Sequence, residues 1–298
     1  RTHAPGTFGS FRKMYEKELT VEQVADVRRP LGIVDNILLP RWGHVPFAEL
    51  SRQHALDLIL DLRNKQYAEQ GVRRIINVAR RFLHLAIRHR LTSHNPFADL
   101  PLQAYEARDR IASDEELRTL LRLGSARMQN AIALAFNLPL REELIITASR
   151  DYRYTRTDGL WYRPPKAPTT IKGRPLELPL NQTAASLLDM TPPLQPLLFP
   201  GWTPNRFGKA WRRLTRRAHI EDLHFHDLRR NAGSLLQAAH VHPGVISLLL
   251  GHKSQEVTDI YKTFDSWRPD LIKAVTILDE AWRRITSTVN DPTQDSTG

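Results

Sequence analysis

Residues 224–230 read HFHDLRR, and after an apolar stretch residues 245–254 read VISLLLGHKS. Tyr261 lies nine residues beyond the histidine of the second segment. On a helix, His226 and Arg229 share one face because they are three residues apart. Taken singly, each feature has an ordinary explanation, such as a polar contact, a glycine helix cap or a tyrosine at the edge of a core. Taken together, they form a specific pattern.

The complete pattern resembles the tyrosine recombinase, or phage integrase, family. Its members carry His-x-x-Arg, then Leu-Gly-His, then a tyrosine nine residues on. Two upstream features agree, namely Leu198-Phe199-Pro200 before a basic helix expected over residues 207–217, and a helical first region that ends in His94-Asn95-Pro96. The resemblance extends from about Gly32 to Arg284. It implies a site-specific DNA recombinase (integrase-like) that cuts and rejoins DNA strands through a 3′-phosphotyrosyl intermediate.

The resemblance gives four residues a role in strand cleavage. Tyr261 is the expected nucleophile, Arg229 binds the phosphate, His226 assists proton transfer and His252 donates to a phosphate oxygen. A phenol with a pKa of about 10 attacks a phosphodiester poorly, so its proton must be accepted and the charge on the phosphate oxygens must be met by fixed donors. The planar fork of arginine suits a phosphate. No metal or cofactor is required, because the phosphotyrosyl bond retains the energy for rejoining.

The first arginine of the family's site lies in Thr-Gly-x-Arg-x-x-Glu-Leu, and its counterpart here is residues 137–144, NLPLREEL. Aligned on Glu143 without a gap, the arginine position falls on Leu140. Arg141 is one residue late, about 100° of helix rotation. A shorter turn, or a path altered by Pro139, would still bring Arg141 into the site. Otherwise one phosphate donor is missing, and the alternative is a catalytically impaired recombinase-like DNA-binding or regulatory protein.

The family's hairpin lysine, the expected general acid, has two candidates. Lys172 lies in a Lys-Gly turn ahead of the strand-like Leu178-Pro179-Leu180, about one residue closer to that strand than expected. Lys166 is the second candidate. The structural alternative is a solvent-exposed turn lysine, because short polar hairpin turns usually have no other role.

An amphipathic helix is predicted over residues 72–90, where apolar residues recur at helical spacing. Its other face carries the candidate DNA-binding residues Arg73, Asn77, Arg80, Arg81, His84 and Arg88. Arginine and asparagine there would contact phosphates and base edges in a major groove. The alternative is a solvated basic face, which is common on amphipathic helices. His94-Asn95-Pro96 is expected to end this helix.

The expected fold is mainly α with a small β-sheet (α+β). It consists of a helical core-site DNA-binding domain and a tyrosine-recombinase-like catalytic domain. The expected boundaries are a flexible lead over 1–20, the DNA-binding domain over 21–107, the catalytic domain over 108–289 and a disordered tail over 290–298.

Local patterns predict several elements of these domains. Residues 49–64 favour an amphipathic helix, and Ser113 with Glu116 forms a capping box that starts another. Residues 128–147 predict a buried helical pair or a helix kinked at Pro139. Residues 159–180 predict a small β-sheet.

Composition restricts the partners and the chemistry. The 43 Lys and Arg exceed the 32 Asp and Glu, for a net charge of +11, which favours a nucleic acid partner. The absence of cysteine excludes disulfides, thiolate nucleophiles and cysteine zinc sites. No apolar run approaches the eighteen residues of a membrane helix, and no nucleotide-binding phosphate loop or metalloprotease motif is present. His240 and His242 have no metal-ligand spacing and are interpreted as loop histidines.

The resemblance also implies an assembly. The expected partner is double-stranded DNA, bound by a homo-tetramer on paired sites, with accessory DNA-bending proteins as a further possibility. Residues 271–285 resemble the family's C-terminal helix, which docks on a neighbouring protomer. Its apolar positions Ile272, Val275, Leu278 and Trp282 fit that role, and packing on its own domain is the alternative. The expected location is the cytoplasm, on bacterial nucleoid or on phage or mobile-element DNA.

Overall fold

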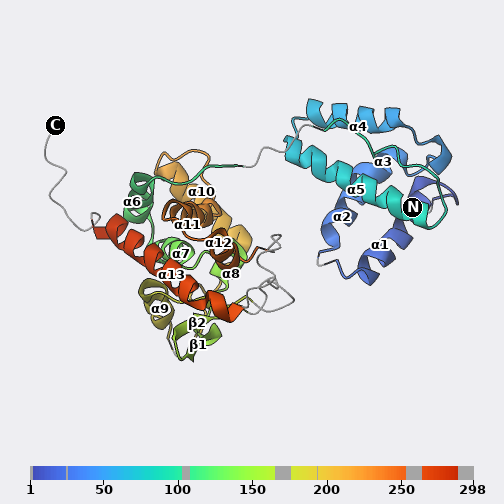
Figure 1. Ribbon diagram of the computed structural model, residues 1–298. Coiled ribbons are helices and arrows are strands. Elements are labelled where there is room, and N and C mark those ends of the chain that lie inside the picture. The colour runs from blue at the N-terminus through green and yellow to red at the C-terminus, as the bar shows by residue number, and fades with distance from the viewer. Residues whose placement is uncertain are drawn as a thin grey trace. The chain divides into compact units, whose positions relative to one another are not determined.

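The computed structural model describes residues 3–24, 26–102, 108–164, 176–192, 194–252 and 264–287. The chain divides into two compact units, Arg1–Ala107 and Arg108–Gly298 (Figure 1). Over the described residues it is mainly helical with one small antiparallel sheet, so the predicted fold class is confirmed. None of the described helices has both the length and the apolar character that a bilayer crossing needs.

The N-terminal unit consists of short helices packed around one long helix. Its elements are η1 (Phe8–Phe11), α1 (Arg12–Val21), α2 (Arg28–Ile33), η2 (Val34–Leu38), α3 (Leu39–Trp42), η3 (Phe47–Glu49), α4 (Arg52–Asn64) and α5 (Glu69–Arg88). The predicted helices over 49–64 and 72–90 are confirmed as α4 and α5, with shifted ends. The apolar face of α5 is buried, as its spacing predicts, and it forms the centre of this unit's core.

The prediction of a flexible lead over residues 1–20 is wrong for η1 and α1. Phe8, Phe11 and Tyr15 are buried, and their rings contact Phe82 of α5 with centroid distances of 4.3, 5.3 and 4.9 Å. Burying an aromatic side chain stabilises a fold by roughly 1.5–3 kcal/mol. Four buried residues, these three and Leu19, therefore hold the segment in place although its helices are short.

Helix α5 also ends earlier than predicted. It ends at Arg88, and Arg90 adopts the left-handed backbone conformation with φ of +58°. The N–H of Leu91 then bonds to the Ala86 carbonyl at 3.0 Å, which closes the helix end. Pro96 therefore lies beyond a helix that has already ended.

The C-terminal unit has eight α-helices, one 3-10 helix and one sheet among its described residues. They are α6 (Asp114–Leu123), α7 (Ala126–Asn137), α8 (Glu142–Ile146), η4 (Arg150–Tyr152), β1 (Arg153–Arg156), β2 (Gly159–Tyr162), β3 (Leu178–Pro179), α9 (Gln182–Asp189), α10 (Pro204–Arg217), α11 (Asp227–Ala238), α12 (Pro243–Leu249) and α13 (Phe264–Ser287). The predicted capping box of α6 is confirmed, because the Ser113 hydroxyl accepts from the Glu116 N–H and the Glu116 carboxylate accepts from the Ser113 N–H. The predicted helical pair is α7 and α8, separated at Pro139.

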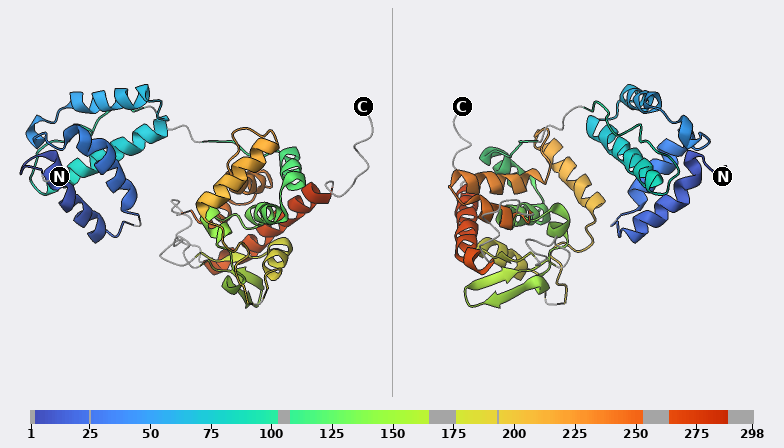
Figure 2. Two further views of the ribbon diagram at one scale, coloured as in Figure 1. Left: turned by 180° about the vertical axis from the view of Figure 1, so that it is seen from behind. Right: turned by 45° about the vertical axis from the view of Figure 1, so that its right-hand side comes forward.

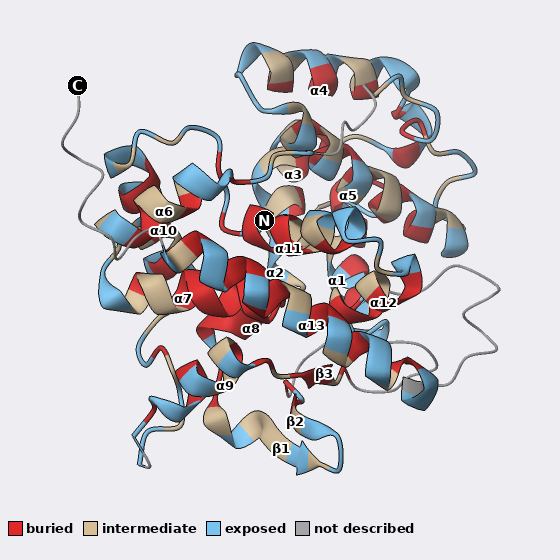
Figure 3. Cartoon of the chain, turned by 60° about the vertical axis from the view of Figure 1, so that its left-hand side comes forward, coloured by how far each residue is buried: buried red, intermediate tan, exposed pale blue. Residues whose placement is uncertain are grey.

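Helix α7 is the centre of the C-terminal unit, and Figure 3 shows it buried along most of its length. Helices α9, α11 and α13 pack around it. The strands β1, β2 and β3 form an antiparallel sheet in that order, with Tyr154 opposite Trp161 and Trp161 opposite Pro179. Figure 2 shows the β1–β2 hairpin at one end of this unit, where Arg156 and Arg268 form ion pairs that join it to the start of α13.

Helix α13, which was predicted to dock on a neighbouring protomer, packs on its own unit in the described residues. Of the four predicted positions, Val275, Leu278 and Trp282 are buried in the core of their own unit and Ile272 is half-buried against it. Phe136 of α7 contacts the Trp282 ring at 5.3 Å. This agrees with the alternative prediction, in which the helix packs on its own domain. The predicted tail over 290–298 lies outside the described residues.

Candidate active site

The first turn of α11 carries two of the predicted site residues. His226 is the N-cap of this helix, and Arg229 lies three residues further along. The Arg229 side chain is buried, at 4% exposure. Its Nη1 donates to the Pro139 carbonyl at 2.5 Å, and its Nη2 donates to the Leu250 carbonyl. Arg229 therefore joins α11 to the α7–α8 turn and to the end of α12.

The end of α12 places His252 beside this arginine. The N–H of His252 bonds to the Ser247 carbonyl at 2.9 Å and that of Gly251 to the Leu248 carbonyl at 3.0 Å, which is a Schellman cap. Gly251 has φ of +55°, and a Cβ there would lie 3.2 Å from Leu176 Cδ2. Gly251 thus caps α12 and turns the chain between Leu250, whose carbonyl binds Arg229, and His252.

The turn between α7 and α8 separates the surroundings of Leu140 from those of Arg141. Leu140 is 2% exposed and belongs to the core, whereas Arg141 is the exposed N-cap of α8. Arg141 follows Pro139, whose carbonyl binds Arg229, by two residues, and its charge contributes to the lowered pKa of Arg229, His226 and His252. The turn is tight, because the Leu140 N–H bonds to the Leu138 carbonyl at 2.6 Å around Pro139. An ungapped alignment would assign the position of the first arginine to Leu140, which is buried, and would leave Arg141 outside the site.

The site has a positive charge that is not balanced. Burial, and secondly the charge of Arg141, lower the pKa of Arg229 to about 10. Among the described residues, no carboxylate forms an ion pair with the Arg229 guanidinium. A buried cation without a counter-charge is costly, and its two carbonyl partners satisfy hydrogen bonds but carry no full charge. An anionic group in this position would relieve the cost.

The two histidines are held toward their neutral forms. For both, loss of contact with water is the largest cause of a lowered pKa, and the charge of Arg229 is the second. Near pH 7 each ring therefore has one N–H donor and one acceptor nitrogen, which suits either proton transfer or donation to a phosphate oxygen.

Lowering the pH should destabilise the fold through these two rings. Their folded pKa lies below the unfolded value of about 6.5, so the unfolded chain binds more protons as the pH falls through that window. We expect the variant His226→Gln, His252→Gln to lose less stability than the wild type between about pH 7 and pH 5. Urea unfolding at each pH measures this. Equal losses in the two proteins would contradict it.

Three predicted catalytic candidates, Tyr261, Lys172 and Lys166, lie outside the described residues. The described part of the site is therefore Arg141, His226, Arg229 and His252. No group of three or more His, Asp or Glu side chains in the described residues is arranged to hold a metal ion. His242 has a structural role, because its Nδ1 accepts from the Gly244 N–H at 3.1 Å and caps α12.

The predicted DNA-binding face of α5 is partly engaged within its own unit. Asn77, His84 and Arg88 are exposed, whereas Arg73, Arg80 and Arg81 are half-buried. Arg80 donates to the Phe97 carbonyl at 2.9 Å and to Asn77 Oδ1 at 3.2 Å.

Glu22, at the end of α1, binds two of the predicted residues. Its carboxylate pairs with Arg81, and with Arg88 Nη1 at 3.4 Å. These pairs join residues 59 and 66 positions apart, so the local pattern of α5 contained no sign of them.

Two sets of basic residues were missed as DNA-contact candidates. Arg74 is exposed and lines, with Arg73, Asn77 and Arg81, an open cavity of about 450 Å³. Helix α10 buries Phe207, Trp211 and Leu214 and exposes a cationic face made of Arg206, Lys209, Arg212, Arg213, Arg216 and Arg217. The i, i+3 and i+4 spacing of these charges was the available signal.

The part of the chain that is similar to a known family includes His226, Arg229 and His252. Residues 197–266 match the phage integrase family. The shufflon-specific DNA recombinase of Escherichia coli is 35% identical over 103 residues, which are 34% of this chain and 27% of that protein. The match thus spans about a quarter of the length of this curated relative.

Solved structures extend the likeness in fold to most of the chain. The Tn1549 transposon integrase in complex with circular intermediate DNA is 15% identical, with a TM-score of 0.64, over 87% of this chain and 98% of that one. A lambda integrase dimer bound to a COC′ core site is also 15% identical, with a TM-score of 0.62, over 86% and 77%. The fold is therefore that of the tyrosine recombinases. Residues 197–266 are similar in sequence to the phage integrase family.

Proposed function

We propose that this protein is a site-specific DNA recombinase that cuts and rejoins DNA strands through a 3′-phosphotyrosyl intermediate. The observation that carries the proposal is the buried Arg229, which has no carboxylate partner among the described residues and lies beside Arg141 and two neutral histidines. A phosphodiester supplies the negative charge that this cluster lacks, and its oxygens match the fork of arginine.

Each residue then has a part in cleavage. Tyr261 attacks the phosphorus, while Arg229 and Arg141 bind the phosphate oxygens, where negative charge increases in the transition state. His226 takes part in proton transfer and His252 donates to a phosphate oxygen. Lys172, or alternatively Lys166, protonates the leaving 5′-oxygen. Cleavage forms the bond from tyrosine oxygen to phosphorus and breaks the bond from phosphorus to that 5′-oxygen, and rejoining reverses both.

The position of Arg141 favours this enzyme over a catalytically impaired DNA-binding protein. The alternative depends on Leu140 occupying the place of the first arginine. Leu140 is in the core, whereas Arg141 is exposed two residues after the carbonyl that binds Arg229, which supports two arginines acting on one phosphate.

The proposed partner is double-stranded DNA, bound through α5 and the cationic face of α10. The lambda integrase structures include a dimer on a core site and a tetramer bound to a Holliday junction, the latter with a TM-score of 0.61 and 15% identity. By analogy we propose a homo-tetramer on paired sites, acting in the cytoplasm. Accessory DNA-bending proteins are a further part of the proposal.

Covalent trapping tests the reaction. The purified protein is mixed with a library of duplexes that contain a randomised segment and a nick, and adducts that survive SDS are recovered and sequenced. We expect an adduct with its DNA on the peptide that contains Tyr261, and no adduct from the control variant Tyr261→Phe. A wild type that binds duplexes of the library tightly but forms no adduct with any of them would show that the protein is not a recombinase.

Glu22→Gln should strengthen binding to DNA, because it releases Arg81 and Arg88 for phosphates. Each released arginine that meets a phosphate steepens the slope of log K against log salt by about 0.9. The exposed pairs that are lost contribute at most about 1 kcal/mol to stability. Titration of a random-sequence duplex at several salt concentrations measures both the affinity and the slope.

The matched control for this prediction is Glu18→Gln. Glu18 also lies on α1, but it pairs with His89 at 2.8 Å rather than with an arginine of the predicted face. Equal affinities for the two variants would mean that Glu22 does not limit access to these arginines.

A further inference from the structure

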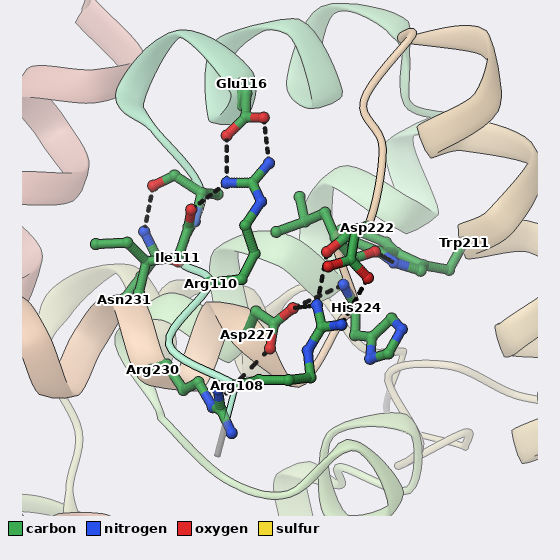
Figure 4. A network of polar contacts seen from close by, with 12 residues as sticks. Arg108, Arg110, Ile111, Glu116, Trp211, Asp222, His224, Asp227, Arg230 and Asn231 are labelled. Carbon is green, nitrogen blue, oxygen red and sulfur yellow. Dashed lines mark hydrogen bonds and ion pairs between the residues drawn. The ribbon is translucent and has the colours of Figure 1, made fainter. Parts of the chain in front are cut away.

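Residues 108–112, the first described residues of the C-terminal unit, are hydrogen-bonded to α11 and to the turn before it (Figure 4). Arg108 donates from Nη1 to Asp222 Oδ1 and from Nη2 to the Asp222 carbonyl, both at 2.6 Å, and from Nη2 to Asp227 Oδ2 at 3.0 Å. Asp227 is 2% exposed, and the same oxygen accepts from the His224 N–H at 2.8 Å. One buried carboxylate thus holds both the chain entering this unit and the turn that leads into α11.

A second pair of hydrogen bonds lies one turn further along α11. The N–H of Ala112 donates to Asn231 Oδ1 at 2.8 Å, and Asn231 Nδ2 donates back to the Ala112 carbonyl at 2.5 Å. These bonds are buried, and removing the Asn231 amide would leave two backbone groups without partners. The segment from Arg108 to Ala112 is therefore bound to α11 at both ends.

These contacts lie on the opposite side of α11 from the candidate active site. Residues on a helix advance by about 100° each, so Asp227 and Asn231 are separated by about 40°. Their mean direction is about 150° from that of His226 and Arg229. On that other side, Arg229 bonds to the Pro139 and Leu250 carbonyls. The helix is held between the entering chain and the site.

We propose that Arg108, Asp227 and Asn231, here called the connector anchor, are positioning residues for strand cleavage. They fix the rotation and the axial position of α11, and therefore the places of His226 and Arg229. This inference rests on the proposed recombinase function. Arg108 is the first residue of the C-terminal unit, so any pull along the covalent connection between the units reaches α11 through the anchor. Displacing a catalytic group by about 1 Å is enough to lower a rate 100-fold.

The test separates the rate of cleavage from binding. Arg108→Gln and Asn231→Ala are compared with the wild type in single-turnover adduct formation, at saturating concentrations of a nicked duplex recovered from the library. We expect a rate about 10- to 100-fold lower, with the Kd for that duplex changed by less than about twofold. Thermal unfolding establishes that each variant is folded at the assay temperature.

Arg110→Gln is the matched control. Arg110 lies in the same segment but pairs with Glu116 of α6 and has no bond to α11, so its variant should cleave at the wild-type rate. Arg108→Gln and Asp227→Asn both break the Arg108–Asp227 contact, so the rate loss in the double variant should be smaller than the product of the two single losses. Arg108→Lys, which keeps the charge, should recover part of the rate.

Three results would overturn the anchor. If folded anchor variants cleave at the wild-type rate, the positioning role of the connector anchor is contradicted, while the proposed recombinase function is unaffected. A parallel fall in rate, Kd and folded fraction would show a structural role only. A wild type that forms no adduct would overturn the proposed function, and the anchor with it.

Discussion

Arg229→Met is expected to lower adduct formation by at least about 10²–10³-fold while changing the free energy of unfolding by no more than about 3 kcal/mol. The loss in rate follows from removing a preorganised donor to the phosphate. The small change in stability follows from two opposing effects. The pKa of Arg229, lowered to about 10, corresponds to roughly 3 kcal/mol of unfavourable burial, which methionine removes. The Pro139 and Leu250 carbonyls lose their donors, at about 1–3 kcal/mol each.

The comparison with Arg229→Lys tests the geometry. Lysine keeps the charge but has no planar fork, so it does not bridge the two carbonyls as arginine does. We expect its rate to be closer to that of methionine than to that of the wild type. The rate at saturating DNA and urea unfolding measure the two quantities, with Arg118→Met on α6 as the same change outside the site. A folded Arg229→Met protein that cleaves at the wild-type rate would contradict the assignment.

The second large effect concerns Arg141 and Leu140, whose roles an ungapped alignment exchanges. Arg141→Ala is expected to lower the cleavage rate by about 10²–10³-fold with little change in stability, because Arg141 is exposed and is the proposed second donor to the phosphate in the transition state. Leu140→Ala is expected to destabilise the fold by about 2–5 kcal/mol, because Leu140 is in the core. The rate per folded molecule should then stay close to that of the wild type.

Leu140→Met keeps the experiment informative if the alanine variant unfolds, since a volume-conserving change usually costs less than about 1.5 kcal/mol. Arg141→Ala should also raise the pKa of His226 and His252, because the charge of Arg141 contributes to lowering both. Histidine signals followed by NMR against pH measure this shift. If the cleavage rate per folded molecule falls in the Leu140 variants and not in Arg141→Ala, the ungapped alignment would be the correct one.

Sequence alone predicted the features that depend on spacing within one element. The His226 and Arg229 pair, the glycine cap before His252 and the buried face of α5 are of this kind. Their side chains are placed by helix periodicity and by cap geometry, which are local properties.

Features that depend on contacts between distant segments could not be predicted in this way. Glu22 meets Arg81 only because α1 packs beside α5, and Asp227 meets Arg108 across 119 residues. The position of Arg141 depends on the backbone path around Pro139. The lead segment is a different case, because Phe8, Phe11, Tyr15 and Leu19 recur every three or four residues and predicted a helix that was overlooked.

The charge of Arg229, which pairs with no carboxylate of the described residues, has a consequence for descent among proteins with this site. Selection for stability alone would discard a buried guanidinium that repels its neighbour Arg141, because apolar replacements of buried charges are often neutral or stabilising. We therefore expect the two arginines to be lost first in descendants that bind DNA but no longer cut it. Their joint presence in a sequence is then a record of recent selection for strand cleavage.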